Sequence, residues 1–295
     1  MVKARTGAEN SLDAVVRLVV AGFVALSVAG CGGSEDAGSG GSNDEVGAPP
    51  TAVSGCNQSS PLTPGVWVEQ TLAVGGTARA YGVRAPDGYN ASRPYPVVYI
   101  FHGCSPAHDN FPPLEDVAAS DAILVRPRAL ADCWTGHPGP HPVPSPDIAF
   151  FDALVPVIER SLCADPARRF VTGYSSGAFL SNALGCVRAG RVRAIATIAG
   201  VSSDASCGGP VAAMIVHGRD DQLVEFAAAE SLRDQFAVQN RCDVSQPRQA
   251  VAPPPCEGYV GCAAGNPVVF CALPGGHSRQ DAFIVPAFWD FFRQF

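Results

Sequence analysis

A glycine-bounded serine stands between a strand-like run and a helix-forming run in RRFVTGYSSGAFLSN, residues 168–182. Apolar residues 170–172 predict the end of a buried strand, and residues 176–185 predict a helix. In a chain with 31 glycines the Gly-x-Ser-x-Gly motif alone has little specificity, so its meaning depends on this context. Ser175 on such a strand-to-helix turn is a candidate nucleophile, and a plain turn serine is the alternative.

The same two kinds of segment alternate along the rest of the chain. Two strand-like stretches within residues 66–84, joined by Gly75-Gly76, predict a β-hairpin. The Pro/Gly-rich stretch 133–146 predicts a loop. This alternation favours an α/β fold with a mostly parallel sheet and helices on both faces, in one domain from residue 56 to the end. We expect further strands at 95–103, 122–127, 193–200 and 212–218, a last strand and loop at 267–277, and helices at 147–162, 227–240 and 281–295.

The first 30 residues are expected to form an export signal. Basic residues precede an apolar run at 18–29, which is too short to span a bilayer and is typical of a signal-peptide core. The run ends in Val-Ala-Gly-Cys, which resembles a bacterial lipobox and implies acylation of Cys31. Ordinary secretion, with cleavage near Ala29, is the alternative.

Residues 31–55 are rich in Gly, Ser and acidic residues and predict a flexible tether. We therefore expect an exported lipoprotein, periplasmic or on the cell surface, that meets the membrane only through its lipid anchor. The formal net charge of −7 gives no reason to expect a nucleic-acid partner.

Cysteine usage points to the same oxidising compartment. Of the 11 cysteines, Cys31 is set aside for lipid, and the others are even in number, which predicts disulfides. A zinc site is the alternative. No Cys-x-x-Cys pair occurs and the six histidines do not cluster with cysteines, so we expect no metal.

A nucleophilic serine needs a base and an acid. In an α/β-hydrolase they follow in the order serine, acid, histidine. The histidines after Ser175 are His217 and His277, and only His277 leaves room for an acid. Asp221 is the expected acid, with Asp220 as the alternative. His277 would then take and return the proton while Asp221 orients the imidazole. His217 is interpreted as a packing or hydrogen-bonding residue.

An oxyanion needs backbone donors. One is expected to be the N–H of Ser176, directly after the nucleophile. The other should come from the loop after strand 95–103, where Cys104 is the choice and Ser105 the alternative. His102 is interpreted as a turn-stabilising residue and not as a base.

Several motifs, in order, resemble those of secreted esterases of the feruloyl esterase and polyhydroxybutyrate depolymerase group, most nearly the feruloyl esterases. They are HGCSP, LCADPARRFVTGYSSGA, HGRDD and PGGHS, and the likeness runs from about Cys56 to His277. The resemblance implies the α/β-hydrolase fold and ester hydrolysis through an acyl-enzyme, without cofactor or metal. Its pattern HG-x-x-D aligns the acid with Asp221.

Two further expectations concern the substrate. Relatives often follow the histidine with an aromatic residue or with threonine and proline, whereas Ser278-Arg279-Gln280 stand here, so the acyl or alcohol pocket should differ. Trp134 lies where substrate could enter and could stack on a phenolic or sugar ring. A structural tryptophan beside a disulfide is the alternative.

Positions along the expected elements suggest disulfide partners, although sequence does not fix the connectivity. A bridge at Cys104 would brace the expected oxyanion loop. The suggested pairs are Cys104–Cys133, Cys186–Cys207, Cys56–Cys163, Cys242–Cys262 and Cys256–Cys271.

The sequence thus predicts a monomeric serine esterase that releases hydroxycinnamoyl or acetyl groups from plant polysaccharide fragments or small esters. A polyhydroxyalkanoate depolymerase is the first alternative. A non-catalytic surface-binding lipoprotein on a hydrolase scaffold is another, and a peptidase stays open because a serine triad alone does not choose ester over amide.

Overall fold

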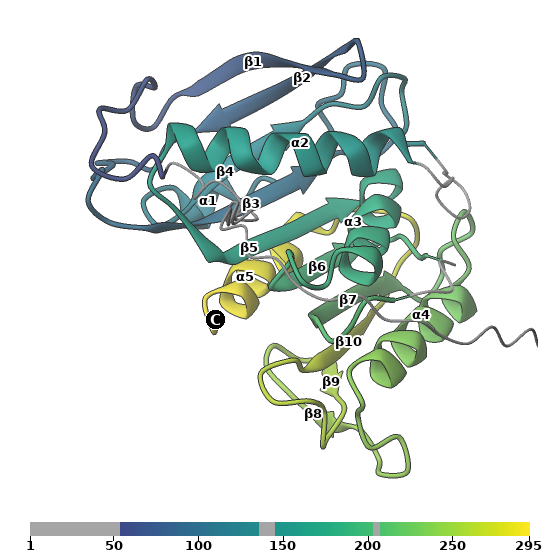
Figure 1. Cartoon of the computed structure of the whole chain (residues 1–295). Helices are drawn as coiled ribbons and strands as arrows, with labels where there is room; N and C mark the ends of the chain where they lie inside the picture. The colour runs from purple at the N-terminus through teal and green to yellow at the C-terminus, as the bar shows by residue number, and fades with distance from the viewer. Residues whose placement is uncertain (1–53, 136–144, 203–206) are drawn as a thin grey trace, which may run out of the picture. The chain divides into compact units, whose positions relative to one another are not determined.

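A computed structural model describes residues 54–135, 145–202 and 207–295. Its strands form one sheet in the order β1-β2-β4-β3-β5-β6-β7-β10-β9-β8 (Figure 1). The long strands are β1 (Trp67–Val74), β2 (Thr77–Arg84), β3 (Tyr95–Phe101), β4 (Ile123–Pro127), β5 (Ala164–Tyr174), β6 (Ala194–Ile198), β7 (Ala212–Gly218) and β10 (Val268–Leu273).

The centre of the sheet is parallel. Strands β4, β3, β5, β6, β7 and β10 pair in parallel, while β1 and β2 at one edge and the short β9 and β8 at the other pair antiparallel. Every residue of β3, β6 and β7 is buried, which their continuous apolar runs predict. Strands of this kind end together at one edge, so loops that follow different strands meet there.

The β1–β2 hairpin turns at Gly75 and Gly76. Both residues have positive φ, 56° and 81°, which the tight turns of two-residue hairpins require and glycine adopts without strain. The hairpin predicted from the sequence is therefore confirmed.

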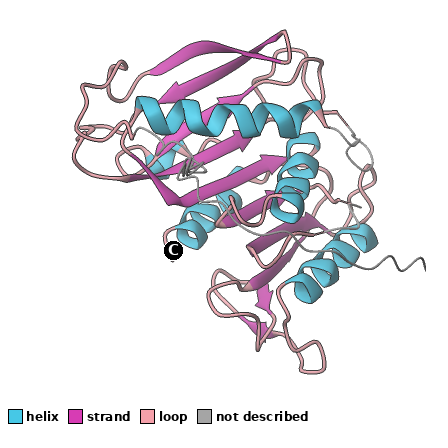
Figure 2. Ribbon diagram, in the orientation of Figure 1, coloured by secondary structure: helices cyan, strands magenta, loops and turns pink. Residues whose placement is uncertain are grey.

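Helices cover both faces of the sheet (Figure 2). On one face α2 (Pro146–Ser161), α3 (Ser176–Val187) and α4 (Phe226–Gln239) bury their apolar residues, while α1 (Glu115–Ala118) and α5 (Asp281–Phe292) pack on the other. Successive β3 residues point to opposite faces, so Val97 joins the first core cluster and Val98 the second. The expected α/β-hydrolase architecture is confirmed in this arrangement.

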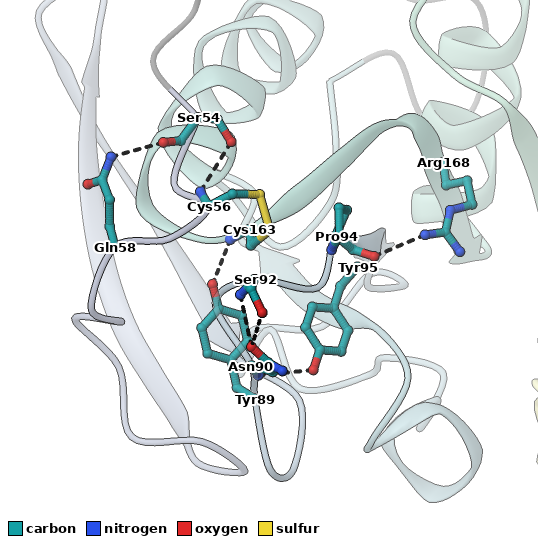
Figure 3. Close-up of a disulfide and its surroundings, with 10 residues drawn as sticks. All are labelled: Ser54, Cys56, Gln58, Tyr89, Asn90, Ser92, Pro94, Tyr95, Cys163 and Arg168. Carbon is teal, nitrogen blue, oxygen red and sulfur yellow. Dashed lines mark hydrogen bonds between the residues drawn. A yellow bond between two sulfur atoms is a disulfide. The ribbon is translucent and has the colours of Figure 1, made fainter.

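Five disulfides join the same cysteine pairs that the sequence suggested. Figure 3 shows Cys56–Cys163, which ties the first described residues to the start of β5. The N–H of Cys163 donates to the hydroxyl of Tyr89 at 2.6 Å, and the N–H of Cys56 donates to Ser54 Oγ at 3.1 Å. The beginning of the domain is thus held by a covalent bond as well as by hydrogen bonds.

The structure also contains elements that the sequence patterns did not predict. Helix α1 has four residues, and β8 (Gln249–Ala250) and β9 (Cys256–Gly258) have two and three. Strand β5 begins at Ala164, ahead of its apolar residues, and its pairing with β3 shifts register between Tyr95 and Val97. Helix α1 and strands β8 and β9 are too short to show a periodicity in the sequence. Their conformation is set by pairing and packing with neighbouring segments.

The signal peptide, Cys31 and nearly all of the tether lie outside the described residues, as do positions 136–144 of the predicted loop. Among the residues that are described, no helix is long and apolar enough to cross a membrane.

Candidate active site

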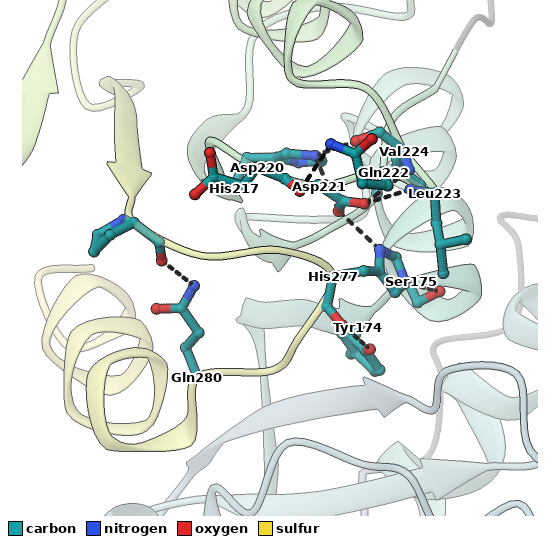
Figure 4. A network of polar contacts seen from close by, with 12 residues as sticks. Tyr174, Ser175, His217, Asp220, Asp221, Gln222, Leu223, Val224, His277 and Gln280 are labelled. Atoms are coloured by element: carbon teal, nitrogen blue, oxygen red, sulfur yellow. Dashed lines mark hydrogen bonds and ion pairs between the residues drawn. The ribbon is translucent and has the colours of Figure 1, made fainter.

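Three side chains from three strand ends meet at the carboxyl edge of the sheet (Figure 4). Ser175 follows β5, Asp221 lies beyond β7, and His277 lies beyond β10. His277 Nε2 is 2.9 Å from Ser175 Oγ, and His277 Nδ1 is 2.8 Å from Asp221 Oδ2. Because a carboxylate only accepts, Nδ1–H donates to Asp221 and Nε2 is left to accept the serine proton. The structure therefore brings together the three residues that the sequence selected.

Ser175 stands on a strained turn. Its φ of 51° and ψ of −119° lie outside the regions that non-glycine residues favour. The glycines on either side make the turn possible. A Cβ on Gly177 would collide with the carbonyls of Phe101 and His102, and a Cβ on Gly173 would collide with Gly177. Ser175 therefore lies at the amino end of α3, where the helix dipole favours negative charge.

Asp221 is buried and fully occupied by hydrogen bonds. Its Oδ1 accepts the N–H groups of Leu223 and Val224, both at 2.9 Å, and its Oδ2 faces His277. Burial acts to raise the pKa of Asp221, but the two N–H donors and His277 outweigh it and the pKa is lowered. Asp221 is therefore ionised at neutral pH, as an acid that stabilises an imidazolium must be.

Asp220, the alternative acid, is exposed and points elsewhere. Its Oδ2 accepts the N–H of Gly275 at 3.3 Å. The geometry therefore favours Asp221 as the partner of His277.

A second histidine lies beside the same carboxylate. His217 is fully buried, and its Nε2 is 2.8 Å from the carbonyl of Val224 and 3.4 Å from Asp221 Oδ2. Burial lowers the pKa of His217, so the ring is neutral at pH 7 and its Nε2–H donates to Val224. This matches the hydrogen-bonding role expected from the sequence.

A cleft of about 370 Å³ opens at Ser175. Leu223 is a conspicuous part of its wall, because 77% of this large apolar residue is exposed. The other residues of the wall are Cys104, Asn110, Tyr174, Val224 and His277. A second cavity, of about 210 Å³, is lined by Pro96 near the start of β3 and by none of the residues that line the cleft. It is therefore separate from Ser175 and His277.

Of the two expected oxyanion donors, Cys104 lines this cleft and Ser176 directly follows Ser175 in the chain. Ser176 is the first residue of α3, where a backbone N–H has no partner within the helix. Cys104 belongs to the wall of the cleft. The N–H of Ser105, the alternative donor, is already bonded to the carbonyl of Asp132 at 2.9 Å.

The expectation that Trp134 stacks on substrate is wrong. Trp134 is 1% exposed, its indole N–H donates to the carbonyl of His102 at 3.0 Å, and its ring packs edge-on against Phe101. An indole gains both apolar burial and a hydrogen bond in this position. His137 and His141, later in the same loop, lie outside the described residues.

His102 is a structural residue, as the sequence predicted. Its Nε2 accepts the N–H of Ala129 at 3.1 Å, so Nδ1–H is the donor to the carbonyl of Gly103 at 2.7 Å. Burial is the main cause that lowers the pKa of His102 to about 4. The neutral ring therefore holds the loop that carries Cys104.

Sequence reasoning missed several residues that line the cleft beside Ser175, among them Asn110 and Tyr174. Arg279 was singled out only as a departure from the family pattern. Its guanidinium donates to Asn110 Oδ1 at 2.9 Å and to the carbonyl of Phe111 at 3.0 Å. Arg279 thus ties the loop after His277 to the segment of Asn110, which lines the cleft.

Within the described ranges, no group of three or more His, Cys, Asp or Glu side chains is arranged to hold a metal ion. The absence of a cofactor stays an expectation.

Comparisons with known proteins agree on one kind of enzyme. The chain is 32% identical to feruloyl esterase D of Neurospora crassa, over 82% of this chain and 90% of that protein. It is 31% identical to feruloyl esterase C of Emericella nidulans, with coverages of 82% and 93%. No protein-family model matches.

Solved structures show the same fold at low identity. An acetyl xylan esterase from Aspergillus awamori has a TM-score of 0.59 at 17% identity, covering 77% of this chain and 99% of that one. A ferulic acid esterase has a TM-score of 0.53 at 18% identity, with coverages of 78% and 99%. The chain therefore shares its fold with these solved structures.

Proposed function

Because the chain belongs to the feruloyl esterase family of carboxylic ester hydrolases, we propose that Ser175, His277 and Asp221 are its catalytic triad. The observation that carries the proposal is the continuous hydrogen-bond line from Ser175 Oγ through the imidazole to a buried, ionised carboxylate. That line supplies what a serine hydroxyl lacks, namely a base and a group that stabilises the charged base.

The first half of the reaction forms an acyl-enzyme. Ser175 Oγ attacks the ester carbonyl carbon while its proton passes to His277 Nε2, and Asp221 stabilises the resulting imidazolium. The carbonyl oxygen becomes an oxyanion that accepts the N–H groups of Ser176 and Cys104. When the tetrahedral intermediate collapses, the ester C–O bond breaks and His277 gives its proton to the leaving alcohol.

The second half regenerates the enzyme. Water attacks the acyl carbon, His277 accepts a proton from that water, and the new intermediate expels Ser175 Oγ. His277 returns the proton to the serine, and the carboxylic acid leaves. No redox step or external group is needed.

For the substrate we propose feruloyl or acetyl esters of plant polysaccharide fragments. The names of the relatives and the mixed wall of the cleft support this. Leu223, Val224 and Tyr174 offer apolar surface to an acyl group, and the NH₂ group of the Asn110 amide offers a donor. Neither polyhydroxyalkanoate hydrolysis nor a non-catalytic surface role gains support from the comparisons.

The place of action follows from the cysteines. Five disulfides indicate an exported protein in an oxidising compartment. Attachment to a membrane through acylated Cys31 stays a prediction, since Cys31 lies outside the described residues.

The experiment that tests the proposal compares three proteins made under oxidising conditions: wild type, Ser175→Ala and Ser231→Ala. Ser231 is a matched control, because it is exposed on α4 and its hydroxyl donates only to the carbonyl of Ala227. Each is assayed with methyl ferulate, a nitrophenyl acetate and a polyhydroxybutyrate suspension. We expect ferulate and acetate release by wild type and Ser231→Ala, and a loss of about 10⁶-fold in Ser175→Ala. Polymer clearing without ferulate release would instead favour the depolymerase.

A further inference from the structure

Residues 132–135, here called the 132–135 segment, each bond to a residue outside the segment. The carbonyl of Asp132 accepts the N–H of Ser105 at 2.9 Å, and Cys133 forms a disulfide with Cys104. The N–H of Thr135 donates to Asp147 Oδ2 at 2.7 Å. A loop segment with this many fixed partners is rigid where most loops are mobile.

Trp134, within this segment, bonds to both sides of the proposed oxyanion hole. Its backbone N–H donates to Ser176 Oγ at 2.8 Å, and its indole N–H donates to the carbonyl of His102 at 3.0 Å. The rings of Phe101 and His102 each lie 5.0 Å from the Trp134 ring, centroid to centroid. The residue is therefore fixed both by hydrogen bonds and by packing.

We propose that Trp134 is a positioning residue that sets the separation of the two oxyanion donors, the N–H groups of Cys104 and Ser176. The inference rests on the proposed function. The Ser176 N–H belongs to the residue whose hydroxyl accepts from the Trp134 backbone. The Cys104 N–H lies two residues after His102, whose carbonyl accepts from the Trp134 indole. Trp134 thus bonds to both places, through its backbone N–H and through its indole N–H.

The physical reason for such a device is the strict geometry of an oxyanion hole. Its donors must lie about 2.7–3.1 Å from the developing oxyanion, and a misplacement of about 1 Å can cost about 100-fold in rate. Ser176 is fixed by α3, but Cys104 lies in a loop. Both hydrogen bonds of Trp134 are buried, so relaxing either would leave an unpaired buried group. The loop is thus held against the helix at a constant distance.

The test uses Trp134→Phe in the full chain, which removes the indole N–H and keeps an aromatic ring. Trp289→Phe is the matched control, because Trp289 is also buried but lies on α5 beside the remote cavity. Both are compared with wild type on methyl ferulate and on its thiono analogue, in which sulfur replaces the carbonyl oxygen. Sulfur is a weak hydrogen-bond acceptor, so the ratio of the two rates measures how well the hole binds an oxyanion.

We expect the oxygen-to-sulfur ratio to fall about tenfold in Trp134→Phe, mainly through kcat, and to stay at the wild-type value in Trp289→Phe. Ser176→Ala, which removes the acceptor of the Trp134 backbone N–H but keeps the Ser176 N–H, should lower the ratio as well. Thermal unfolding of each variant shows that it is folded.

The outcomes separate the two proposals. If wild type cleaves methyl ferulate and the ratio is unchanged in Trp134→Phe and Ser176→Ala, with both rates merely lowered in parallel, Trp134 is only structural and this inference is overturned. If folded wild type cleaves no ester, the proposed function itself fails and the inference fails with it.

Discussion

Ser175 Oγ lies 2.9 Å from His277 Nε2, although 102 residues separate them in the chain. The distance is set by two strand ends, because Ser175 follows β5 and His277 follows β10 at the same edge of the sheet. Neither side chain needs to move for a proton to pass between them.

Asp221→Asn should lower kcat about 10⁴-fold. The amide oxygen can still accept from Leu223 and Val224, but its NH₂ group would face His277 Nδ1 and stabilise the wrong imidazole tautomer. Steady-state kinetics on a nitrophenyl acetate measures the loss. Asp220→Asn is the control and should keep nearly full activity. A larger effect from Asp220→Asn would move the acid to Asp220.

The same carboxylate should contribute to stability in a defined pH range. The folded pKa of Asp221 lies below its ordinary value of 3.8, so its contribution is present above that pH and is lost as pH falls through the folded pKa. The free energy of unfolding of wild type should therefore exceed that of Asp221→Asn by the largest amount at neutral pH. This difference, the gap between the two proteins, should narrow below pH 4. Denaturant unfolding at several pH values gives this gap. A gap that widens on acidification would mean that Asp221 is protonated in the folded protein.

Leu223→Ala should weaken aromatic ester hydrolysis selectively. The side chain is a 77% exposed apolar wall of the cleft, so a feruloyl group would cover it and an acetyl group would not reach it. We expect kcat/KM for methyl ferulate to fall about tenfold, with little change for nitrophenyl acetate. Val238→Ala, at a comparably exposed position on α4, should change neither. Equal losses on both esters would place the acyl group elsewhere.

Two disulfides of similar span should differ in their effect on catalysis. Replacing Cys104 and Cys133 by alanine opens a loop whose ends are 29 residues apart in the chain. Replacing Cys242 and Cys262 opens one whose ends are 20 residues apart. Each double variant should lose about 3 kcal/mol of unfolding free energy by the chain-entropy argument. Only the first should also lose kcat, because Cys104 carries a proposed oxyanion donor. Denaturant unfolding and kcat are measured for both double variants. An equal loss of kcat in the two variants would contradict this account.

The sequence selected Ser175, Asp221 and His277, which the structure brings together, because strand ends, chain order and the family pattern all pointed to these residues. It predicted the central strands because both their faces are buried, which leaves continuous apolar runs. It missed β8 and β9, whose pairing depends on β10 and on the Cys256–Cys271 bridge.

It also misplaced Trp134. An aromatic residue in a Pro/Gly-rich stretch looks the same in sequence whether it faces solvent or the core. Only the fold brings the His102 carbonyl and the Ser176 hydroxyl to the two N–H groups of Trp134. Contacts between two separate loops and a helix end leave no local pattern in the sequence.

The central claim, that Ser175 carries the acyl group, is tested most directly by acid-quenching wild type during turnover of nitrophenyl acetate and locating any acyl adduct by peptide mass spectrometry. We predict one acetyl group on Ser175, formed within the first turnover and absent from Ser175→Ala. Hydrolysis that continues with no adduct on Ser175, or with the acetyl group on another residue, would contradict the account.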